Sequence, residues 1–234
     1  MSKKDSSFGF IIAAVIAVVV VVIIMVKITA DPGGGEYNAT VAEVVETDWV
    51  RGGESPKVTL IEYSDFECSA CASYQRIFSQ VFKDFGDDVR LVYRHFPLRG
   101  IHEHAFSAAQ AAEAAGIQGK FWEMHDILYS NQTAWVNASE PKDLFVEYAE
   151  RIGLDTDQFL KDFDLEEVAK GIEENEQQAQ EQNFSGTPTI FLNGTQVKNI
   201  ETYEDLKALV EEAGAEANET VTPTFQTKSA TSTI

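Results

Sequence analysis

The 234-residue sequence contains only two cysteines, Cys68 and Cys71, and few basic residues. Two cysteines cannot form the multiple disulfides of a small secreted scaffold, and they cannot supply a four-thiolate zinc site. The chain has 18 Lys and Arg against 38 Asp and Glu, a formal net charge of −20. This charge argues against nucleic-acid binding, which needs cations to neutralise phosphates, and against a position flat on anionic lipid.

One long apolar run lies near the N-terminus. Residues 8–26, FGFIIAAVIAVVVVVIIMV, carry no charge and are long enough to cross a bilayer core of roughly 30 Å. A cleaved signal peptide has a shorter apolar region, roughly 7–15 residues, and a small-x-small cleavage site, whereas Lys27 follows this run directly. Lys3 and Lys4 precede the run and favour a cytoplasmic N-terminus. We therefore predict that residues 1–27 form a stub and single membrane anchor, with the rest of the chain extracytoplasmic.

Two further segments differ in composition from a folded domain. Residues 28–48 contain Pro32 and a run of three glycines, and they predict a flexible tether. Residues 214–234 are rich in Thr, Ser and Ala without an apolar period, and they predict a disordered tail. The predicted folded domain is therefore residues 49–213.

The pattern within this domain predicts strands and helices in alternation. Runs of β-branched apolar residues predict strands, apolar residues at helical spacing predict helices, and an Asn-Gly pair predicts a hairpin turn. The predicted elements are a strand at 57–63, a helix from Cys71 to Gly86, a strand at 88–96, a helical block at about 100–182, a hairpin at 187–199 and a helix at 201–214. This order indicates an α/β fold with an inserted all-helical subdomain.

The two cysteines lie three residues apart where the first strand gives way to a helix. Cys68 opens the helix, where the helix dipole and free backbone N–H groups favour a thiolate and lower the pKa. Cys71 is one turn further along, beside the apolar stripe. An exposed thiolate followed by a sheltered thiol suits thiol–disulfide exchange, because the second thiol can resolve the mixed disulfide that the first one forms.

Two other interpretations of the cysteine pair compete with redox chemistry. A structural disulfide would close so short a loop that it would restrict the unfolded chain very little. A tetrahedral zinc site would need two more ligands, and the chain offers no other cysteine and only four histidines. These are His95, His102, His104 and His125. We predict no metal and no cofactor.

Two motifs resemble those of a known family. The stretch VTLIEYSDFECSAC, with GTPTIFLNG about 120 residues later, is similar to the DsbA family of thioredoxin-fold disulfide oxidoreductases, especially its membrane-tethered, exported members. The resemblance covers about residues 49–213 and implies a thioredoxin-like fold with a helical insertion. It implies that Cys68 is the nucleophile, that Cys71 is the resolving thiol, and that the two form a redox-active disulfide.

The resemblance also assigns three residues around the cysteines. The cis-proline of the family falls on Pro188, and it leaves the backbone of Thr187 able to pair with an extended client peptide. An ordinary trans proline at the start of a strand is the alternative. The buried acid of the family falls on Glu62, which would have a raised pKa and could take the proton of Cys71. A carboxylate turned to solvent at the edge of a strand is the alternative.

One departure from the family bears on the direction of electron flow. Ser69 and Ala70 separate the cysteines, whereas strongly oxidising members carry Pro-His there, and Glu67 would oppose a thiolate if it pointed inward. We expect a membrane-anchored extracytoplasmic oxidoreductase that introduces disulfides into exported proteins, with their thiols as substrates and a membrane redox partner. The alternatives are a reductase or isomerase kept reduced by a membrane partner, and a redox-inert metal-binding or chaperone module.

Overall fold

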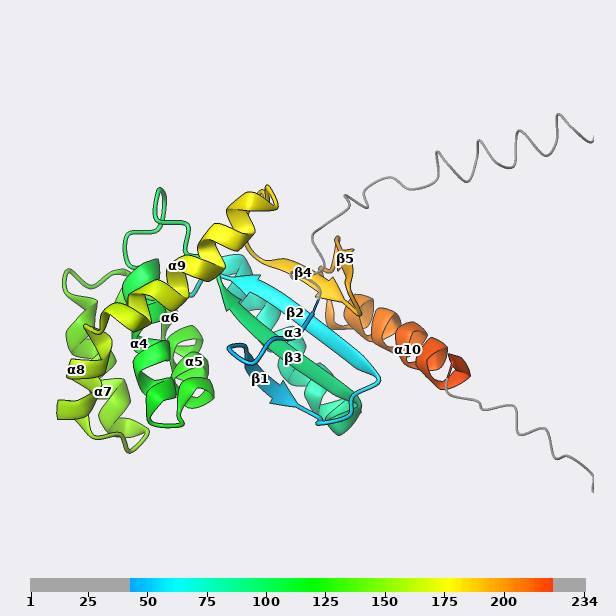
Figure 1. Ribbon diagram of the computed structural model, residues 1–234, viewed down its shortest axis with the longest axis horizontal. Coiled ribbons are helices and arrows are strands. Elements are labelled where there is room, and N and C mark those ends of the chain that lie inside the picture. Colours follow the sequence, from blue (N-terminus) through cyan, green and yellow to red (C-terminus); the bar gives the residue numbers. More distant parts are fainter. Residues whose placement is uncertain (1–42, 221–234) are drawn as a thin grey trace, which may run out of the picture. The chain divides into compact units, whose positions relative to one another are not determined.

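The computed structural model describes residues 43–220 of the chain. At the centre of this part is a five-stranded sheet in the order β1-β3-β2-β4-β5 (Figure 1). Strands β2 and β3 are parallel, and each of the other neighbouring pairs is antiparallel. The strands are β1 (Trp49–Gly52), β2 (Val58–Ser64), β3 (Val89–His95), β4 (Thr189–Leu192) and β5 (Thr195–Val197).

The two central strands are buried on both faces of the sheet. Strand β2 reads VTLIEYS and strand β3 reads VRLVYRH, and nearly all of their side chains are buried. This explains why both sequences are almost continuously apolar rather than alternating. Their parallel register pairs Val58 with Val89 at one end and Ser64 with His95 at the other. The carboxyl ends of both strands therefore lie at the same edge of the sheet.

Two helices, α3 (Ser69–Phe85) and α10 (Tyr203–Thr220), pack against one face of this sheet. The apolar cluster that joins them to the sheet includes Leu60 of β2 and Phe78 of α3. A short 3₁₀ helix, η1 (Gly86–Asp88), then leads from α3 into β3. Helix α3 therefore runs antiparallel to β2, and its N-terminus lies at the carboxyl end of that strand.

A block of six helices is inserted between β3 and β4 (Figure 1). The Ala-rich helix α4 contacts α5, α7, α8 and α9, and its buried residues are all alanines. Small side chains allow these helices to approach α4 closely. The block lies within the segment 100–182 that the sequence predicts to be helical. Its helices are α4 (Ala105–Ile117), α5 (Phe121–Ser130), α6 (Gln132–Val136), α7 (Pro141–Arg151), α8 (Thr156–Phe163) and α9 (Glu166–Glu181).

The predicted membrane anchor lies outside the described residues. Its span, residues 8–26, precedes residue 43, as does most of the predicted tether. Among the helices of residues 43–220, none combines the length and the apolarity needed to cross a bilayer. The anchor therefore stays a prediction.

The predicted end of the last helix is wrong. Helix α10 continues through Gly214 to Thr220, so residues 214–220 are helical and do not belong to a disordered tail. The sequence after this glycine, AEANET, includes good helix formers, and a single glycine lowers helix stability by only about 1 kcal/mol. Residues 221–234 of the predicted tail lie outside the described part.

The predicted start of the folded domain is also too late. Asp48, placed in the tether, forms an ion pair of 2.7 Å with Arg94 of β3, and both side chains are almost fully buried. Arg94 also donates a hydrogen bond of 2.6 Å to the carbonyl oxygen of Glu43. A buried guanidinium needs such partners, and this need ties residues 43–48 to the sheet.

Strand β1 is an element that the sequence pattern does not predict. It is only four residues long, but Trp49 stacks on Phe121 of α5 at a centroid distance of 4.3 Å. The indole of Trp49 also donates a hydrogen bond of 2.7 Å to Glu113 of α4. This edge strand therefore joins the sheet to the helical block.

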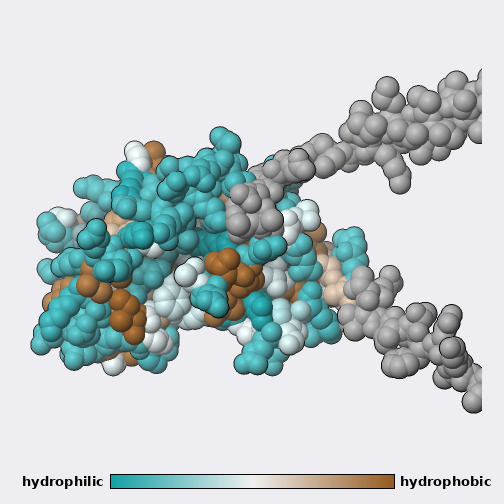
Figure 2. Space-filling model, in the orientation of Figure 1, coloured by the Kyte–Doolittle hydropathy of each residue, from teal (hydrophilic) through white to brown (hydrophobic). Residues whose placement is uncertain are grey.

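The face of the molecule in Figure 2 is mostly hydrophilic with small apolar patches, in keeping with the excess of acidic residues.

Candidate active site

The two cysteines lie at the carboxyl edge of β2, where α3 begins. Cys68 is the N-cap residue of α3, and its N–H donates to the carbonyl of Asp65 at 3.1 Å. Gln132 of α6 holds the loop from the other side, because its amide donates to the carbonyl oxygens of Phe66 and Cys68 at 2.8 and 3.0 Å. The start of α3 is therefore held by both the sheet and the helical block.

The structure holds both cysteines as free thiols. The predicted Cys68–Cys71 disulfide therefore stays a prediction about the oxidised form. Cys68 is 9% exposed and Cys71 is fully buried, so the order of exposure is as expected, although Cys68 is far less exposed than the sequence suggests. Thr187, distant in the sequence, accounts for part of this burial, because its carbonyl oxygen is 3.5 Å from the sulfur of Cys68.

The environment separates the two thiols by their pKa values. The hydrogen bond from the Cys71 thiol is the main cause that lowers the pKa of Cys68 to about 5, although burial opposes this shift. The backbone N–H groups of Cys71 and Ala70 also favour the Cys68 thiolate, although neither meets the sulfur in full hydrogen-bond geometry in this reduced form. Burial, the interaction with Cys68 and the charge of Glu62 together raise the pKa of Cys71 well above its usual range.

The Thr187–Pro188 peptide bond is cis, as the resemblance implies. Strand β4 pairs antiparallel with β2, with Thr189 opposite Tyr63. This register places the residues just before β4 at the carboxyl end of β2, next to the start of α3. Sheet pairing therefore brings Thr187 to within hydrogen-bond distance of Cys68, 119 residues earlier in the chain.

Glu62 is fully buried in the middle of β2, which rules out the solvent-facing alternative. One carboxylate oxygen accepts a hydrogen bond of 2.8 Å from Ser64, and the other accepts one of 3.0 Å from Gln75 of α3. Burial is the largest influence and raises the pKa of Glu62 to about 8, against the lowering effect of these two donors. A carboxyl group with this pKa can exchange a proton near neutral pH.

Sequence reasoning missed Ser64, Gln75 and Tyr129 as members of this site. The hydroxyl of Ser64 lies 2.9 Å from that of Tyr129 on α5, and Tyr129 lies 3.3 Å from the hydroxyl of Tyr93. Ser64 could have been found from the period of two in a strand, which puts it on the same face as Glu62. Tyr129 could not, because it reaches the site from the helical block.

A histidine also reaches the site from the loop between β3 and α4. Nδ1 of His102 lies 2.7 Å from the fully buried carboxylate of Asp65, three residues before Cys68. Burial lowers the pKa of His102, but the hydrogen bond and charge of Asp65 outweigh burial, and Glu67 and Cys68 add to the rise above the ordinary value. A side chain that can carry a positive charge thus lies near the nucleophile, although none stands between the cysteines.

Glu67 has a defined partner in the same loop. Its carboxylate accepts a hydrogen bond of 2.7 Å from the backbone N–H of His104, at the start of α4. Glu67 therefore holds the loop before α4 in place.

Two other histidines, His95 and His125, have partners away from the sulfurs. His95 pairs with Glu113, and His125 pairs with Asp126, each at 2.8 Å. Burial lowers the pKa of His125 to about 4, so this ring is neutral at physiological pH. Within residues 43–220, no group of three or more His, Cys, Asp or Glu side chains is arranged to hold a metal ion.

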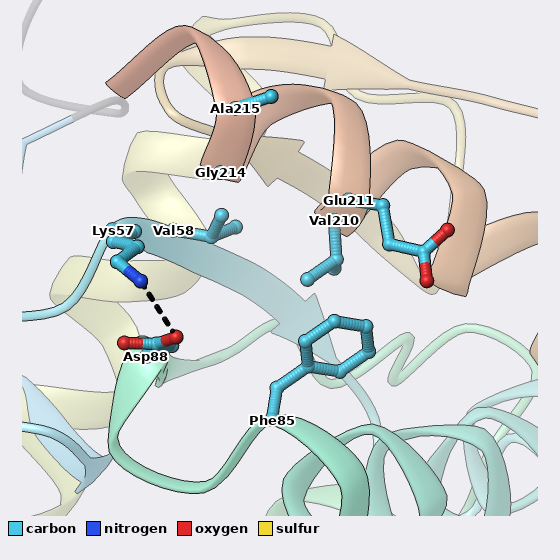
Figure 3. A pocket seen from close by; sticks show the side chains of 8 residues that line it. All are labelled: Lys57, Val58, Phe85, Asp88, Val210, Glu211, Gly214 and Ala215. Atoms are coloured by element: carbon cyan, nitrogen blue, oxygen red, sulfur yellow. Dashed lines mark hydrogen bonds and ion pairs between the residues drawn. The ribbon is translucent and has the colours of Figure 1, made fainter. Parts of the chain in front are cut away.

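Two hollows differ in their relation to this site. One, of about 520 Å³, lies between α3 and α5 and is lined in part by Gln75 and Tyr129, both of which belong to the site network. The other, of about 280 Å³, lies between α10 and the end of α3, beside the Lys57–Asp88 ion pair (Figure 3). Lys57 precedes β2 and the cysteines follow it, so this second hollow is at the opposite end of the strand and takes no part in the site.

Curated relatives match most of this chain but only a small part of their own length. Among curated relatives, the chain is 41% identical over 170 residues to "Na(+)/H(+) antiporter NhaA 1" of Salinispora arenicola and 34% identical over 166 residues to "Na(+)/H(+) antiporter NhaA" of Herminiimonas arsenicoxydans. These matches cover 73% and 71% of this chain but only 25% of each relative. The chain thus spans about a quarter of the length of these relatives, and antiport is a property that their names give to the whole proteins.

Solved structures with DsbA-like folds superpose on most of the chain. A thioredoxin-like oxidoreductase from Silicibacter pomeroyi is 29% identical, with a TM-score of 0.59 over 72% of this chain and 93% of that one. BdbD from Bacillus subtilis is 23% identical, with a TM-score of 0.65 over 78% and 97%. The alpha-DsbA1 protein of Wolbachia pipientis is 16% identical, with a TM-score of 0.68 over 76% of this chain and 96% of that one. At these low identities, the last two structures show a similar fold.

The family model described as "Thioredoxin" matches residues 44–212. This range includes the sheet, the helical block, both cysteines and the cis-proline loop. The expected α/β thioredoxin-like fold with a helical insertion is therefore confirmed. By this match the chain belongs to the thioredoxin family, in the DsbA-like form of its fold.

Proposed function

We propose that this protein is a membrane-anchored, extracytoplasmic thiol–disulfide oxidoreductase that introduces disulfides into exported proteins. The observation that carries the proposal is the pairing of two unlike thiols. Cys68, with its pKa lowered to about 5, lies beside the buried Cys71, whose pKa is raised. A thiolate that is ready to react next to a protonated resolving thiol is the arrangement that disulfide exchange requires.

The low pKa of Cys68 favours the oxidising direction. A stabilised thiolate lowers the free energy of the reduced form relative to the disulfide, and the disulfide then tends to pass to a client. The loop histidine, His102, supports the same direction, because its cationic form favours a thiolate nearby. A reductase or isomerase is the second candidate, because Ser69 and Ala70 supply no charge between the cysteines.

The surroundings of Cys68 suit an unfolded client. The backbone of Thr187, beside the sulfur, is placed to pair with an extended peptide. A hollow of about 410 Å³ lies beside the loop after β3 and includes Phe96, Leu98 and Ile101 in its lining. Ile101 is 76% exposed, so it offers an apolar contact to a client. Membrane anchoring through residues 8–26 and a membrane redox partner complete the proposal.

The test is the reduction potential of the pair in the full-length protein, held in detergent micelles and equilibrated with glutathione buffers. A disulfide-introducing enzyme should have a potential above about −180 mV, whereas a reductase should lie near about −270 mV. The same preparation should oxidise a reduced model protein by one disulfide per equivalent. Cys68→Ser should abolish this transfer. A potential near the lower value would refute disulfide introduction in favour of the reductase, and stoichiometric zinc without any transfer would refute both.

A further inference from the structure

Ser64 is a buried hydroxyl that lies between the acid and the resolving thiol of the site. It is 1% exposed, and its Oγ lies 2.8 Å from Oε1 of Glu62 and 2.9 Å from the hydroxyl of Tyr129. Cys71 is also fully buried, so bulk water does not reach its sulfur directly. Neighbouring side chains are therefore the groups in position to take a proton that Cys71 loses.

The spacing of the strand and the helix places Ser64 against Cys71. Residues two apart in a strand lie on one face, roughly 6.6 Å apart, and residues four apart in a helix lie on one face, roughly 6 Å apart. Gln75 of α3 bonds to Glu62 of β2. Since α3 runs antiparallel to β2, the residue four before Gln75 lies opposite the residue two after Glu62. These residues are Cys71 and Ser64, and the hydroxyl of Ser64 does lower the pKa of Cys71.

The hydrogen bonds around Ser64 have one consistent direction when Glu62 is ionised. A carboxylate only accepts, so Ser64 donates its proton to Glu62. The hydroxyl oxygen of Ser64 then accepts from Tyr129 at 2.9 Å, although the same Tyr129 proton also points toward the carbonyl oxygen of Asp65 at 3.4 Å, and Tyr93 donates to Tyr129. Once Cys68 is in a mixed disulfide and is no longer a thiolate, the S–H of Cys71 is free to donate to the second lone pair of Ser64. Ser64 thus accepts from the thiol on one side and donates to the carboxylate on the other.

We propose that the Ser64 hydroxyl relays the proton between Cys71 and Glu62 during disulfide exchange. The proposal rests on the proposed oxidoreductase function and adds a residue to it. When Cys71 attacks a mixed disulfide at Cys68, its proton moves to Ser64 as the proton of Ser64 moves to Glu62. The Cys71 sulfur then bonds to the Cys68 sulfur, the bond from Cys68 to the client breaks, and the client leaves as a thiolate.

The reverse step uses the same path. When a client thiolate attacks Cys68 of the disulfide, Cys71 leaves with the bonding electron pair and receives a proton from Glu62 through Ser64. The number of protons and electrons is the same on both sides of each step, and the client is the only other reactant. The relay therefore serves either direction of electron flow.

Several other titratable groups surround this path and share its pH dependence. Tyr129, Tyr93 and Tyr74 all have pKa values raised by burial, and they stay protonated near neutral pH. The groups that face the path from β2, β3, α3 and α5 are Glu62, Asp65, Tyr93, Cys68, Cys71, Tyr74 and Tyr129. Of these, Glu62 has a pKa of about 8, so it gives the expected inflection.

The test follows resolution by Cys71 in a single turnover. The reduced full-length protein in detergent micelles is mixed with one equivalent of dithiodipyridine in a stopped-flow instrument. Attack by Cys68 releases the first thiopyridone, and attack by Cys71 on the resulting mixed disulfide releases the second. In the wild type the rate of the second phase should rise to an inflection near pH 8 and then level off.

Ser64→Ala should slow the second phase at least about tenfold at pH 7, a smaller loss than the roughly 10²–10⁴-fold contribution of a complete general base, because Glu62 remains in place. Its rate should then rise steadily with pH, as hydroxide removes the proton, and approach the wild type in alkali. Tyr148→Phe is the matched control, because it removes the hydroxyl of a buried tyrosine on α7 that takes no part in the hydrogen bonds around Ser64, and it should leave the profile unchanged. Ser64→Ala combined with Glu62→Gln should be no slower than Glu62→Gln alone.

Each other outcome has a defined meaning. A normal rate and inflection in Ser64→Ala would overturn the relay, and so would an equal loss of rate at every pH, which indicates a structural role. A wild type that never releases the second thiopyridone would refute the oxidoreductase function itself. If Ser64→Ala does not fold, the wild type in mixtures of light and heavy water decides: a curved dependence of the rate on deuterium content indicates two protons in flight, and a straight line overturns the relay.

Discussion

At the scale of single residues, position gives two identical thiols opposite properties. Cys68 lies at the N-cap position of α3 and interacts with the Cys71 thiol, whereas Cys71 lies within the core near a buried acid. The hydrogen bond from Cys71 is the main cause of the low pKa of Cys68, with a smaller contribution from Thr187, whereas burial is the main cause of the high pKa of Cys71, with a smaller contribution from Glu62. The chemistry of the site therefore depends on burial and on a few hydrogen bonds more than on residue type.

The first prediction assigns a different task to each sulfur. Cys71→Ser should accumulate covalent client complexes at Cys68, because the resolving thiol is missing. Cys68→Ser should accumulate few complexes and lose activity, because the lowered pKa belongs to Cys68. Non-reducing gels of cell extracts measure both. Faster alkylation of Cys71 than of Cys68 in the reduced wild type at pH 6 would contradict the assignment.

The second prediction concerns the pH dependence of stability through Glu62. The folded pKa of about 8 lies above the ordinary 4.5, so between these values the folded protein keeps a proton that the unfolded chain has lost. The contribution of Glu62 to the free energy of unfolding therefore falls as the pH rises through this window, by about 1.4 kcal/mol per pH unit.

Glu62→Gln has no titratable group at this position. Its free energy of unfolding should therefore not show the fall with pH that Glu62 causes in the wild type. Relative to the wild type, the variant should become steadily more stable between about pH 4.5 and pH 8. Urea unfolding midpoints of the reduced proteins at several pH values measure the difference. If the urea midpoints of the two proteins change with pH in parallel, burial does not hold Glu62 neutral.

At the scale of elements, the segment before β1 is held by one buried ion pair. Asp48 accepts two hydrogen bonds from Arg94, at 2.7 and 2.8 Å. The guanidinium of Arg94 also donates a hydrogen bond of 2.7 Å to the hydroxyl oxygen of Tyr63 on β2. These contacts link residues 43–48 to the two central strands.

The third prediction tests this link. Asp48→Ala leaves the charge of Arg94 buried without its carboxylate and should lower the free energy of unfolding by roughly 3 kcal/mol. Asp88→Ala is the matched control, because it breaks the Lys57–Asp88 pair at the surface (Figure 3) and should cost about 1 kcal/mol or less. Urea unfolding of both variants gives the comparison. Equal losses would mean that burial does not strengthen the Asp48 link.

At the scale of the whole molecule, the acidic domain and the apolar N-terminal run predict one membrane orientation. Lys3 and Lys4 precede the run, and nearly all of the acidic residues follow it. The proposed substrates, thiols of exported proteins, are on the same side as the domain in this orientation.

The fourth prediction is therefore a topology. Protease added to intact spheroplasts should digest residues 49–213, while a cytoplasmic control protein survives. The digestion should not require detergent. A domain protected from protease, or a mature N-terminus beyond Ala30, would contradict the predicted anchor.

The sequence by itself determined the features that depend on neighbouring residues. The apolar runs of β2 and β3, the helix that follows Cys68 and the Asn193-Gly194 hairpin follow from side-chain period and turn chemistry, which act within a few residues. The same local pattern put the cysteines at a strand–helix junction. For this reason the fold, and the two cysteines as its candidate site, were predictable.

Only the tertiary structure decided which distant groups meet at the cysteines. The antiparallel pairing of β4 with β2 brings Thr187 to Cys68, and the packing of α5 brings Tyr129 to Ser64. The loop after β3 brings His102 to Asp65, and burial in the sheet gives Glu62 its raised pKa. These contacts join residues 37 to 119 positions apart, and they exist only because strand register and core packing hold the segments together.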